Sequence, residues 1–394
     1  MLSQIIAVTG VNIRSIPARL GSSTVAVVGI AGVVLVFVAV LSIAEGVNAT
    51  MKASGDPNLA LIMRAGSDTE MTSGLGGDSV RVIQDAPGIA RDASGVALTS
   101  PELFVVVDHP LKRSGSPANV PLRGVTPEAF KVHDHLKIID GRNIDFGKKE
   151  IIAGRAAARQ FVGLNVGTEL KWGENTWTLV GIFDDRGSVS ESELWCDVKV
   201  LQPAYRRGNS YQSVYARLAS PDSFQQLKDA LTSNPQLTVS AMRAPEYYGS
   251  QTQTLQMIIR TIGMIIGVLM GIGAVFGAVI TMYTAVASRT REIATLRALG
   301  FGSIPVVLSV LVEAVLLSLV GGIFGGVIAW AAFDGYETAT MNFQSFSQIA
   351  FQFAVTPALL AQALLYSIIM GLLGGFFPAW RAARLPVVTA LREL

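Results

Sequence analysis

Three histidines are the side chains of this 394-residue chain that most invite a metal-binding interpretation. His133 and His135 flank Asp134, and His109 is the third histidine of the sequence. Histidines two residues apart can share a metal ion if they lie on one side of a strand. A surface histidine beside an aspartate is far more common without a metal, so the sequence predicts no metal site.

The usual motifs of hydrolysis and nucleotide binding are also missing. No segment has the form G-x-x-x-x-G-K-[ST], which cradles the phosphates of ATP, and neither H-E-x-x-H nor G-x-S-x-G occurs. Cys196 is the one cysteine, so no internal disulfide or two-thiol metal site can form, and we expect a small, partly buried apolar residue. The sequence therefore predicts no catalytic residue, no bound cofactor and no energy source within the chain.

One carboxylate lies in the middle of an apolar segment. Glu313 is the single charged residue between Ile304 and Phe333, about 14 Å along a helix that begins at Ile304. An ionised carboxylate inside a bilayer costs roughly 2.5 to 3.5 kcal/mol, so its side chain is expected to face protein. A structural hydrogen bond to a neighbouring helix is the favoured role. A switch or proton-linked role and snorkelling toward the interface are the alternatives.

A short run between two apolar segments mixes charged residues with apolar ones at helical spacing. A glycine closes this run and supplies a stop signal. The residues concerned are Arg291, Glu292, Ile293, Leu296, Arg297, Leu299 and Gly300. This pattern predicts a short amphipathic helix. The alternative is a surface turn whose arginines only hold the membrane topology.

The composition indicates a membrane protein. Half of the residues are hydrophobic, 15% are charged, and the mean hydropathy is +0.46, which is high for a soluble domain of this length. The 31 basic and 29 acidic residues leave a net charge of +2, too small an excess for a nucleic-acid partner.

Four apolar runs are long enough to cross a bilayer as helices, which takes about 20 residues each. They span residues 25–44, 261–287, 304–333 and 358–377. The first run is too long for a cleaved signal peptide. The segments 1–24, 288–303 and 378–394 contain eight arginines between them, whereas residues 334–356 contain no lysine or arginine. By the positive-inside rule, both termini and residues 288–303 are cytoplasmic, and 334–357 forms an external loop.

The remaining segment, residues 45–260, is then an extracytoplasmic domain. Its short strands alternate with short helices, which predicts a mixed α/β fold. Strands are expected at 101–108, 120–125, 150–154, 177–183, 213–218 and near 237–240; helices are expected at 155–161 and after Ser220. Residues 246–260 are helix-compatible and are expected to project as a stalk from the second span.

Glycines recur at four-residue spacing within the spans, which allows helix backbones to approach closely. These include Gly263, Gly267 and Gly271, then Gly273 and Gly277, then Gly321 and Gly325, Gly322 and Gly326, and Gly371 and Gly375. The pattern indicates packing within one four-helix unit or an interface with a second copy. Four spans leave little room for a polar conduit, which favours partnership with a second subunit.

Several of these segments together resemble the MacB/FtsX-type ABC transporter permeases. The resemblance rests on residues 288–300, Glu313 with Gly321 and Gly322, the tail at 377–386 and 390–392, and the start at 12–15. In the outer domain it rests on 87–89, 120–125, 141–142 and 179–184. The likeness covers nearly the whole chain, and the run at 288–300 with the tail carries most of its specificity.

The resemblance implies a multi-pass protein of the bacterial inner membrane, surrounded by lipid, with one span, a large outer domain and three further spans. It implies a homo- or heterodimer of permeases with an ATP-binding ABC ATPase, and a role as coupling helix for residues 288–303. Because only 24 residues precede the first span, we expect the ATPase to be a separate subunit. A periplasmic adaptor and an outer-membrane channel are further possible partners of such a system.

Two functions are compatible with such a protein. The first is an ATP-driven lever that moves the outer domain and so exports or extracts a substrate. The second is a signalling transducer that controls extracytoplasmic partners, such as cell-wall hydrolases, without transport. The large outer domain favours the first, and the substrate is not written in the sequence.

Overall fold

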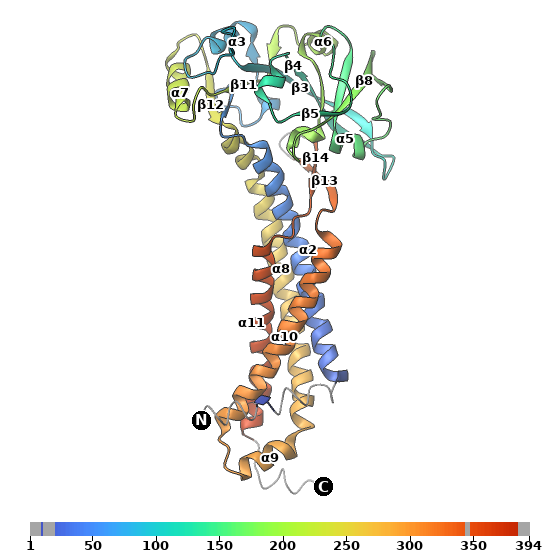
Figure 1. The fold of residues 1–394 in the computed structure, drawn as a ribbon, viewed down its shortest axis with the longest axis vertical. Helices are drawn as coiled ribbons and strands as arrows, with labels where there is room; N and C mark the ends of the chain where they lie inside the picture. The colour runs from blue at the N-terminus through green and yellow to red at the C-terminus, as the bar shows by residue number, and fades with distance from the viewer. Residues whose placement is uncertain (1–8, 11–19, 343–346, 385–394) are drawn as a thin grey trace. The chain divides into compact units, whose positions relative to one another are not determined.

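The computed structural model describes residues 9–10, 20–342 and 347–384, which divide into two compact units. Among these residues, the membrane unit contains those up to Glu45, Leu255–Tyr336 and those from Phe353 onward. The outer unit contains Gly46–Thr254 and Glu337–Gln352. Figure 1 shows both units and labels many of their helices and strands. The first unit is helical and the second is built around a sheet.

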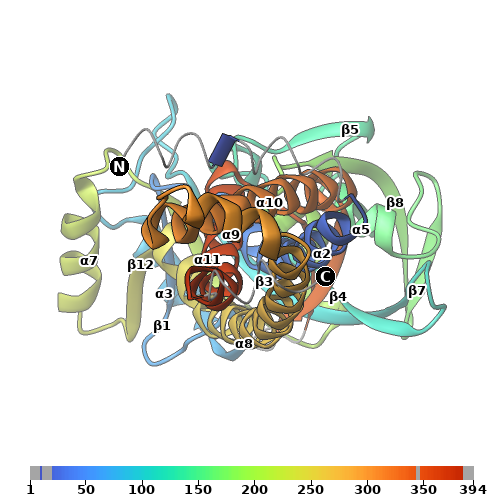
Figure 2. The same ribbon diagram turned by 90° about the horizontal axis from the view of Figure 1, so that it is seen from below.

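Among the residues that the structure describes, four helices are long and apolar enough to cross a membrane. They are α2 (Leu20–Ser54), α8 (Ala244–Ala287), α10 (Ser303–Phe333) and α11 (Pro357–Ala383). Each contains one of the four spans expected from the sequence, so the four-span fold is confirmed. In the membrane unit the four helices run side by side as a bundle, as the view in Figure 2 shows.

The fourth span begins as expected and ends later than expected. The Thr356 hydroxyl accepts a hydrogen bond from the Leu359 amide at 3.2 Å, and Pro357 takes the first helical position. The helix then continues through Pro378 to Ala383, beyond Phe377, where the tail was expected to begin. Membrane helices tolerate an internal proline because neighbouring groups satisfy the freed carbonyl.

All of the glycines that were singled out, except Gly273 and Gly277, face other helices of the same unit. A Cβ on Gly321 or Gly325 of α10 would meet the backbone oxygen of Val27 or Ala31 at 2.8 or 2.4 Å. Similar close approaches are made by Gly263 to Val40, Gly267 to Phe37, Gly271 to Tyr366, Gly371 to Ser318 and Gly375 to Ala314. Gly273 and Gly277 have nothing within 4 Å. The first group therefore packs the bundle, and the second lies on its outer face.

The outer unit is built on a mixed ten-stranded sheet. Its strand order is β12-β1-β11-β3-β4-β9-β6-β8-β5, and β7 pairs with β8. The pairs β4–β9 and β6–β8 are parallel and the others antiparallel. The strands are β1 (Leu59–Arg64), β3 (Thr99–Pro110), β4 (Pro117–Val125), β5 (Lys137–Gly141), β6 (Glu150–Gly154), β7 (Glu169–Trp172), β8 (Asn175–Asp184), β9 (Leu194–Asp197), β11 (Ser213–Arg217) and β12 (Val239–Arg243).

Short helices cover the sheet and complete two apolar cores. One core joins β1, β11 and β12 to α3 (Gly77–Gln84) and α7 (Ser223–Ser233); the other joins β3, β4, β6, β8 and β9 to α5 (Arg155–Gln160) and α6 (Val198–Ala204). Smaller elements are η2 (Glu70–Thr72), β2 (Leu75–Gly76), α4 (Ala129–Val132), η3 (Val189–Ser192) and β10 (Ser210–Tyr211). The mixed α/β class expected for this domain is confirmed.

The segment between the third and fourth spans is more than the loop that was expected at 334–357. It contains the antiparallel strands β13 (Glu337–Asn342) and β14 (Ser347–Gln352), which belong to the outer unit. Alternate residues of β14 are buried, as in a half-covered strand. The Ala350 amide donates to the Ser192 hydroxyl at 2.9 Å, and Arg159 pairs with Glu337. These contacts explain why the segment folds with the outer unit.

Candidate functional site

The short helix expected between the second and third spans is α9 (Thr290–Ala298) of the membrane unit. Gly300 follows it with a φ of +93°, a conformation that favours glycine. The Gly300 amide donates to the Arg297 carbonyl, and the Phe301 amide donates to the Leu296 carbonyl, both at 3.1 Å. The glycine therefore ends the helix as the sequence predicts.

The apolar residues of α9 divide between the interior and the surface. The sequence analysis placed Ile293 among the residues that contact a partner. The structure instead buries it in a cluster with Met282 and Val306, so its side chain cannot contact a partner. Its helical position turns it toward α8 and α10, and burying it there removes apolar area from solvent. Leu296 is half-buried, and Leu299 is 73% exposed. The exposed apolar surface of α9 is thus smaller than the sequence pattern suggests.

The charged residues of α9 divide in the same way. The Arg297 guanidinium donates to the Ala383 carbonyl at 3.0 Å, at the last residue of α11. A cation there is favoured by the negative end of the helix dipole. Arg291 and Glu292 are exposed. The candidate coupling surface therefore consists of Arg291, Glu292, Leu296, Leu299 and Gly300.

Glu313 faces protein, and its partner is a residue that the sequence analysis did not select. Arg289, directly before α9, places Nη1 3.3 Å from Glu313 Oε2, and both side chains are less than a tenth exposed. Arg289 Nε also lies 3.5 Å from Glu292. This pair joins the start of α9 to the middle of α10. A lone carboxylate within a span needs a nearby cation, and this signal points to the arginines of residues 289–297.

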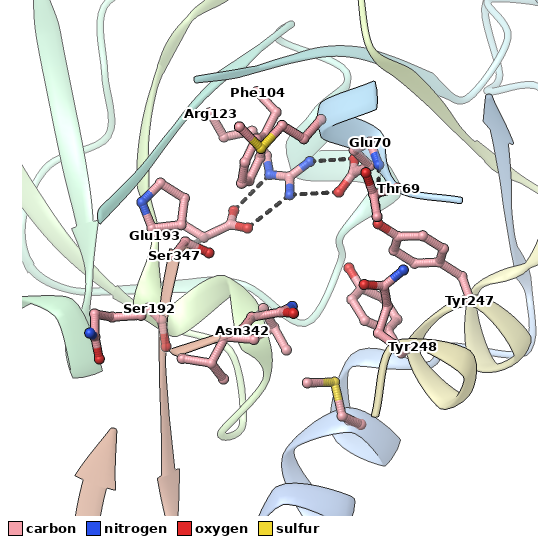
Figure 3. A pocket seen from close by; sticks show the side chains of 17 residues that line it. Thr69, Glu70, Phe104, Arg123, Ser192, Glu193, Tyr247, Tyr248, Asn342 and Ser347 are labelled. Atoms are coloured by element: carbon pink, nitrogen blue, oxygen red, sulfur yellow. Dashed lines mark hydrogen bonds and ion pairs between the residues drawn. The ribbon is translucent and has the colours of Figure 1, made fainter. Parts of the chain in front are cut away.

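A second buried charge cluster lies in the outer unit, and the sequence analysis missed it entirely. Arg123 of β4 is surrounded by the carboxylates of Glu70, Glu102 and Glu193 (Figure 3 shows the first and the last). Its Nη1 lies 2.8 Å from Glu70 and 2.7 Å from Glu102, and its Nε lies 2.7 Å from Glu193. All four side chains are less than a tenth exposed. We call this set the Arg123 cluster.

Strand register brings these charges together. Arg123 lies opposite Phe104 of β3 on one side and Trp195 of β9 on the other, while Glu102 lies opposite Ser213 of β11. Charged residues inside otherwise apolar strand sequences were the available signal: PELFVVVD contains Glu102, VPLRGV contains Arg123 and ELWCD begins at Glu193. Pattern analysis shows that such residues are unusual, but only the register shows that they meet.

Burial and neighbouring charge act against each other within the Arg123 cluster. Burial disfavours the ionised Glu102, yet Arg123 and His133 hold the pKa of this carboxyl below its usual range. At Glu193 burial prevails over the attraction of Arg123 and raises the pKa of the carboxyl. Although burial opposes the charge of Arg123 too, the three carboxylates raise the pKa of its guanidinium. One cation therefore holds carboxylates that differ in protonation behaviour.

A small cavity of about 40 Å³ opens over the Arg123 cluster. Its wall includes Met51 from α2, Tyr247 and Tyr248 from the first turns of α8, and Asn342 and Ser347 from the β13–β14 hairpin (Figure 3). All of these residues belong to the outer unit. This volume suits ordered water and is too small for a drug-sized ligand.

The three histidines have separate partners. His133 Nε2 lies 3.1 Å from Glu102, His135 lies 3.4 Å from Asp134, and His109 Nε2 lies 2.6 Å from the Val162 carbonyl. The oxygens and nitrogen of Asp56, Asp134 and His135 approach one another within 4.8 Å. The Arg217 guanidinium already lies between the two aspartates, at 3.6 and 3.0 Å, so we assign no metal ligand here. Cys196 is fully buried, and burial raises the pKa of its thiol.

Comparison with known families covers both units. Residues 23–234 match the family described as MacB-like periplasmic core domain, and residues 264–387 match the FtsX-like permease C-terminal family. These regions contain every strand of the outer sheet except β12, the Arg123 cluster, α9 and Glu313.

Curated relatives are macrolide export ATP-binding/permease proteins MacB. The protein from Nitrosomonas europaea is 26% identical over 57% of this chain and 34% of its own length. MacB 1 from Yersinia pestis is 29% identical over 57% of this chain and 35% of its own length. The protein from Pasteurella multocida is 25% identical over 73% of this chain and 45% of its own length. The chain thus spans about a third to a half of the relatives it matches.

Solved structures similar to this chain include two extracytoplasmic domains. The extracellular domain of the noncanonic ABC-type transporter YknZ from Gram-positive bacteria is 15% identical, with a TM-score of 0.36, over 47% of this chain and 100% of that one. The periplasmic region of MacB from Actinobacillus actinomycetemcomitans is 13% identical, with a TM-score of 0.38, over 52% of this chain and 98% of that one.

Proposed function

Because the chain belongs to the MacB/FtsX-type family of ABC transporter permeases, we propose that it couples ATP hydrolysis by a separate nucleotide-binding subunit to movement of its outer unit. This movement drives export or extraction of a substrate. The sequence has no phosphate-binding loop, so we expect the ATP site and the catalytic residues to belong to the nucleotide-binding subunit. The observation that carries the proposal is α9, a short helix with an exposed mixed surface that is fixed to two membrane helices.

The exposed surface of α9 has the chemistry that helix-in-groove docking requires. Leu296 and Leu299 supply apolar anchors, while Arg291 and Glu292 supply charges of both signs. Apolar anchors give such interfaces most of their affinity, and charges set the register. We infer that the ATPase receives this surface in a groove.

Two contacts attach α9 to neighbouring membrane helices, so that a movement of α9 can be passed to them. The Arg289–Glu313 pair ties its start to α10, and the Arg297 hydrogen bond to Ala383 ties its end to α11. Breaking a buried ion pair by removing one partner costs about 3 to 5 kcal/mol. A push on α9 is therefore passed to both helices instead of being lost in local rearrangement.

The β13–β14 hairpin provides a covalent path onward. The chain leaves α10 at Phe333 and enters β13 at Glu337; it leaves β14 at Gln352 and enters α11 at Pro357. The hairpin is held in the outer unit by Ser192 and Arg159. Displacement of α10 and α11 is thus expected to reach the outer unit through this hairpin as well as through α2 and α8.

The proposed orientation follows from the distribution of arginines, with both termini and α9 in the cytoplasm. Reporter fusions at Leu299 and Leu394 should read as cytoplasmic, and a fusion at Gly187 as extracytoplasmic. An extracytoplasmic reading at Leu299 would remove α9 from the reach of any cytoplasmic ATPase and would overturn the proposal.

A second permease copy is the other proposed partner. Gly273 and Gly277 leave a smooth strip on the outer face of α8, beside the exposed side chains of Leu269, Phe276 and Ile280. Small residues at this spacing allow close helix approach in a bilayer.

The purified chain alone should show no ATP hydrolysis, and activity should appear when the nucleotide-binding subunit is added. Robust hydrolysis by the chain alone would contradict the proposal.

A further inference from the structure

The Arg123 cluster contains more negative than positive charge. All five N–H groups of the guanidinium are used: Nε and Nη2 donate to Glu193, Nη1 and Nη2 donate to Glu70, and Nη1 donates to Glu102. Three ionised carboxylates against one guanidinium leave two negative charges uncompensated, and the raised pKa of the Glu193 carboxyl reflects the cost of burying such charge. Uncompensated charge is costly at a buried site, so the cluster has a strong tendency to acquire a proton.

The hydrogen bonds indicate where a proton can enter. Both oxygens of Glu193 accept from Arg123, and Oε2 also accepts from the Trp195 indole at 2.8 Å. Both oxygens of Glu70 accept from Arg123, and Oε1 also accepts from the Ser213 hydroxyl at 2.6 Å. Glu102 uses Oε2 for Arg123 and turns Oε1 toward His133 Nε2 at 3.1 Å.

His133 is suited to carry that proton. Its side chain is 13% exposed, so it links the buried cluster to solvent. Its ring makes edge-to-face contacts with the rings of Trp195 and Tyr215, with interplanar angles of 69° and 62°. Protonation of its imidazole would place a cation beside Glu102 and would reduce the net charge of the site from two negative charges to one.

The other titratable groups around the site come from every element packed against it. The half-buried Asp185, whose pKa burial raises, interacts electrostatically with His133 and His135. Burial also raises the pKa values of Tyr215, Tyr247 and Tyr248, which keeps these hydroxyls neutral. The titratable groups named so far are Glu70, Glu102, Arg123, His133, His135, Asp185, Glu193, Tyr215, Tyr247 and Tyr248. Beside His133, Arg217 also donates to the Val132 carbonyl at 2.6 Å and pairs with Asp134 at 3.0 Å.

Two tyrosines connect the cluster to the first turns of α8. The Glu70 amide donates to the Tyr247 hydroxyl at 3.3 Å, and the hydroxyls of Tyr215 and Tyr248 lie 3.0 Å apart. Both α8 tyrosines also line the cavity over Arg123 (Figure 3). A change in charge at the cluster is therefore felt where α8 is anchored in the outer unit.

We propose that His133 and the Arg123 cluster form a proton-operated switch that controls the anchoring of the first turns of α8. With His133 protonated, the cluster keeps one excess negative charge and Tyr247 and Tyr248 stay packed over it. With His133 neutral, the second excess charge draws water into the cavity and loosens this turn.

The test is amide hydrogen exchange of residues 244–251, measured on the full chain in lipid nanodiscs at about pH 5.5 and about pH 8, which bracket ordinary histidine titration. Exchange of α7 in the same unit supplies the correction for the intrinsic effect of pH. We expect corrected exchange in 244–251 to be about tenfold faster at the higher pH, because local opening of this turn becomes easier.

Three single variants should each give a different exchange behaviour. Glu102→Gln removes one negative charge and should keep exchange slow at both pH values. His133→Gln removes the switchable cation and should keep it fast at both. His135→Gln is the matched control and should behave like the wild type, since His135 does not contact Glu102. Exchange that is independent of pH in the wild type, or pH dependence that survives His133→Gln or is lost in His135→Gln, would overturn the proposal. This switch goes beyond the proposed coupling function, and its test requires no ATPase.

Discussion

The two buried charge clusters differ in their balance. In the membrane unit, Arg289 faces one buried carboxylate, that of Glu313, and lies 3.5 Å from the exposed carboxylate of Glu292. In the outer unit, Arg123 faces three. A balanced pair holds two elements together, and its neutral net charge does not favour a change of protonation. A cluster with excess negative charge favours the binding of a proton. The comparison assigns the membrane pair to mechanical linkage and the outer cluster to pH response.

The largest effect is expected when the one cation of the outer cluster is removed. Arg123→Met leaves three buried carboxylates without a guanidinium and should destabilise the outer unit by at least about 3 to 5 kcal/mol. Chemical denaturation followed by the fluorescence of Trp195 and its neighbours measures this loss. Arg113→Met, at an exposed arginine of the same unit, is the matched control and should change stability little. Equal stability of the two variants would show that Arg123 does not compensate the buried carboxylates of the outer unit.

A smaller effect is expected at the balanced pair, and it should depend on what replaces the carboxylate. Glu313→Gln keeps the shape and the hydrogen-bonding capacity and should yield folded protein. Glu313→Ala leaves Arg289 buried without this carboxylate and should reduce the yield of folded protein by several-fold. Size-exclusion chromatography in detergent measures both.

The double variant Arg289→Leu with Glu313→Leu sharpens this test. Removing both charges should restore much of the folded yield that Glu313→Ala loses, because a buried pair can be replaced by apolar residues at little cost. Normal folding combined with lost ATPase coupling in Glu313→Gln would instead support a switch role for the membrane carboxylate, and the contrast between the two clusters would fail.

The smallest effect is expected at a partly exposed pair in the outer unit. Hydrogen bonding from Arg142 lowers the pKa of Glu150 to about 2, against the effect of burial. Because the folded pKa is depressed, the stabilisation is present above about pH 4.5 and is lost as pH falls toward about 2. Arg142→Ala should flatten this acid limb of the denaturation profile while changing stability at neutral pH far less than Arg123→Met does. An unchanged acid limb would contradict the assignment.

The sequence was sufficient where the signal is local. Apolar run length identified all four spans, and Gly300 marked a helix end. It failed where structure depends on pairing between distant segments. The strands β13 and β14 are fixed by their contacts with Ser192 and Arg159, and neither contact can be read from the sequence of these strands.

The candidate sites show the same limit. Helical spacing predicted α9 but did not reveal that Ile293 and Arg297 face their own chain. Glu313 stood out because it interrupts an apolar run, yet Arg289 had no such signal. The four members of the Arg123 cluster come from η2, β3, β4 and the residue before β9, and only the sheet register brings them together.

The central claim is that α9 transmits the action of an ATPase, and the most direct test alters its exposed surface. Leu296→Asp and Glu292→Arg are introduced in the full chain, with Ile139→Asp and Glu169→Arg as matched controls on exposed positions of the outer unit. The measurement is co-purification of the nucleotide-binding subunit together with its hydrolysis rate in membranes. We expect both α9 variants to insert normally and to lose about tenfold or more of the stimulated hydrolysis, while the controls keep it. Unchanged binding and stimulation in both α9 variants would contradict the account.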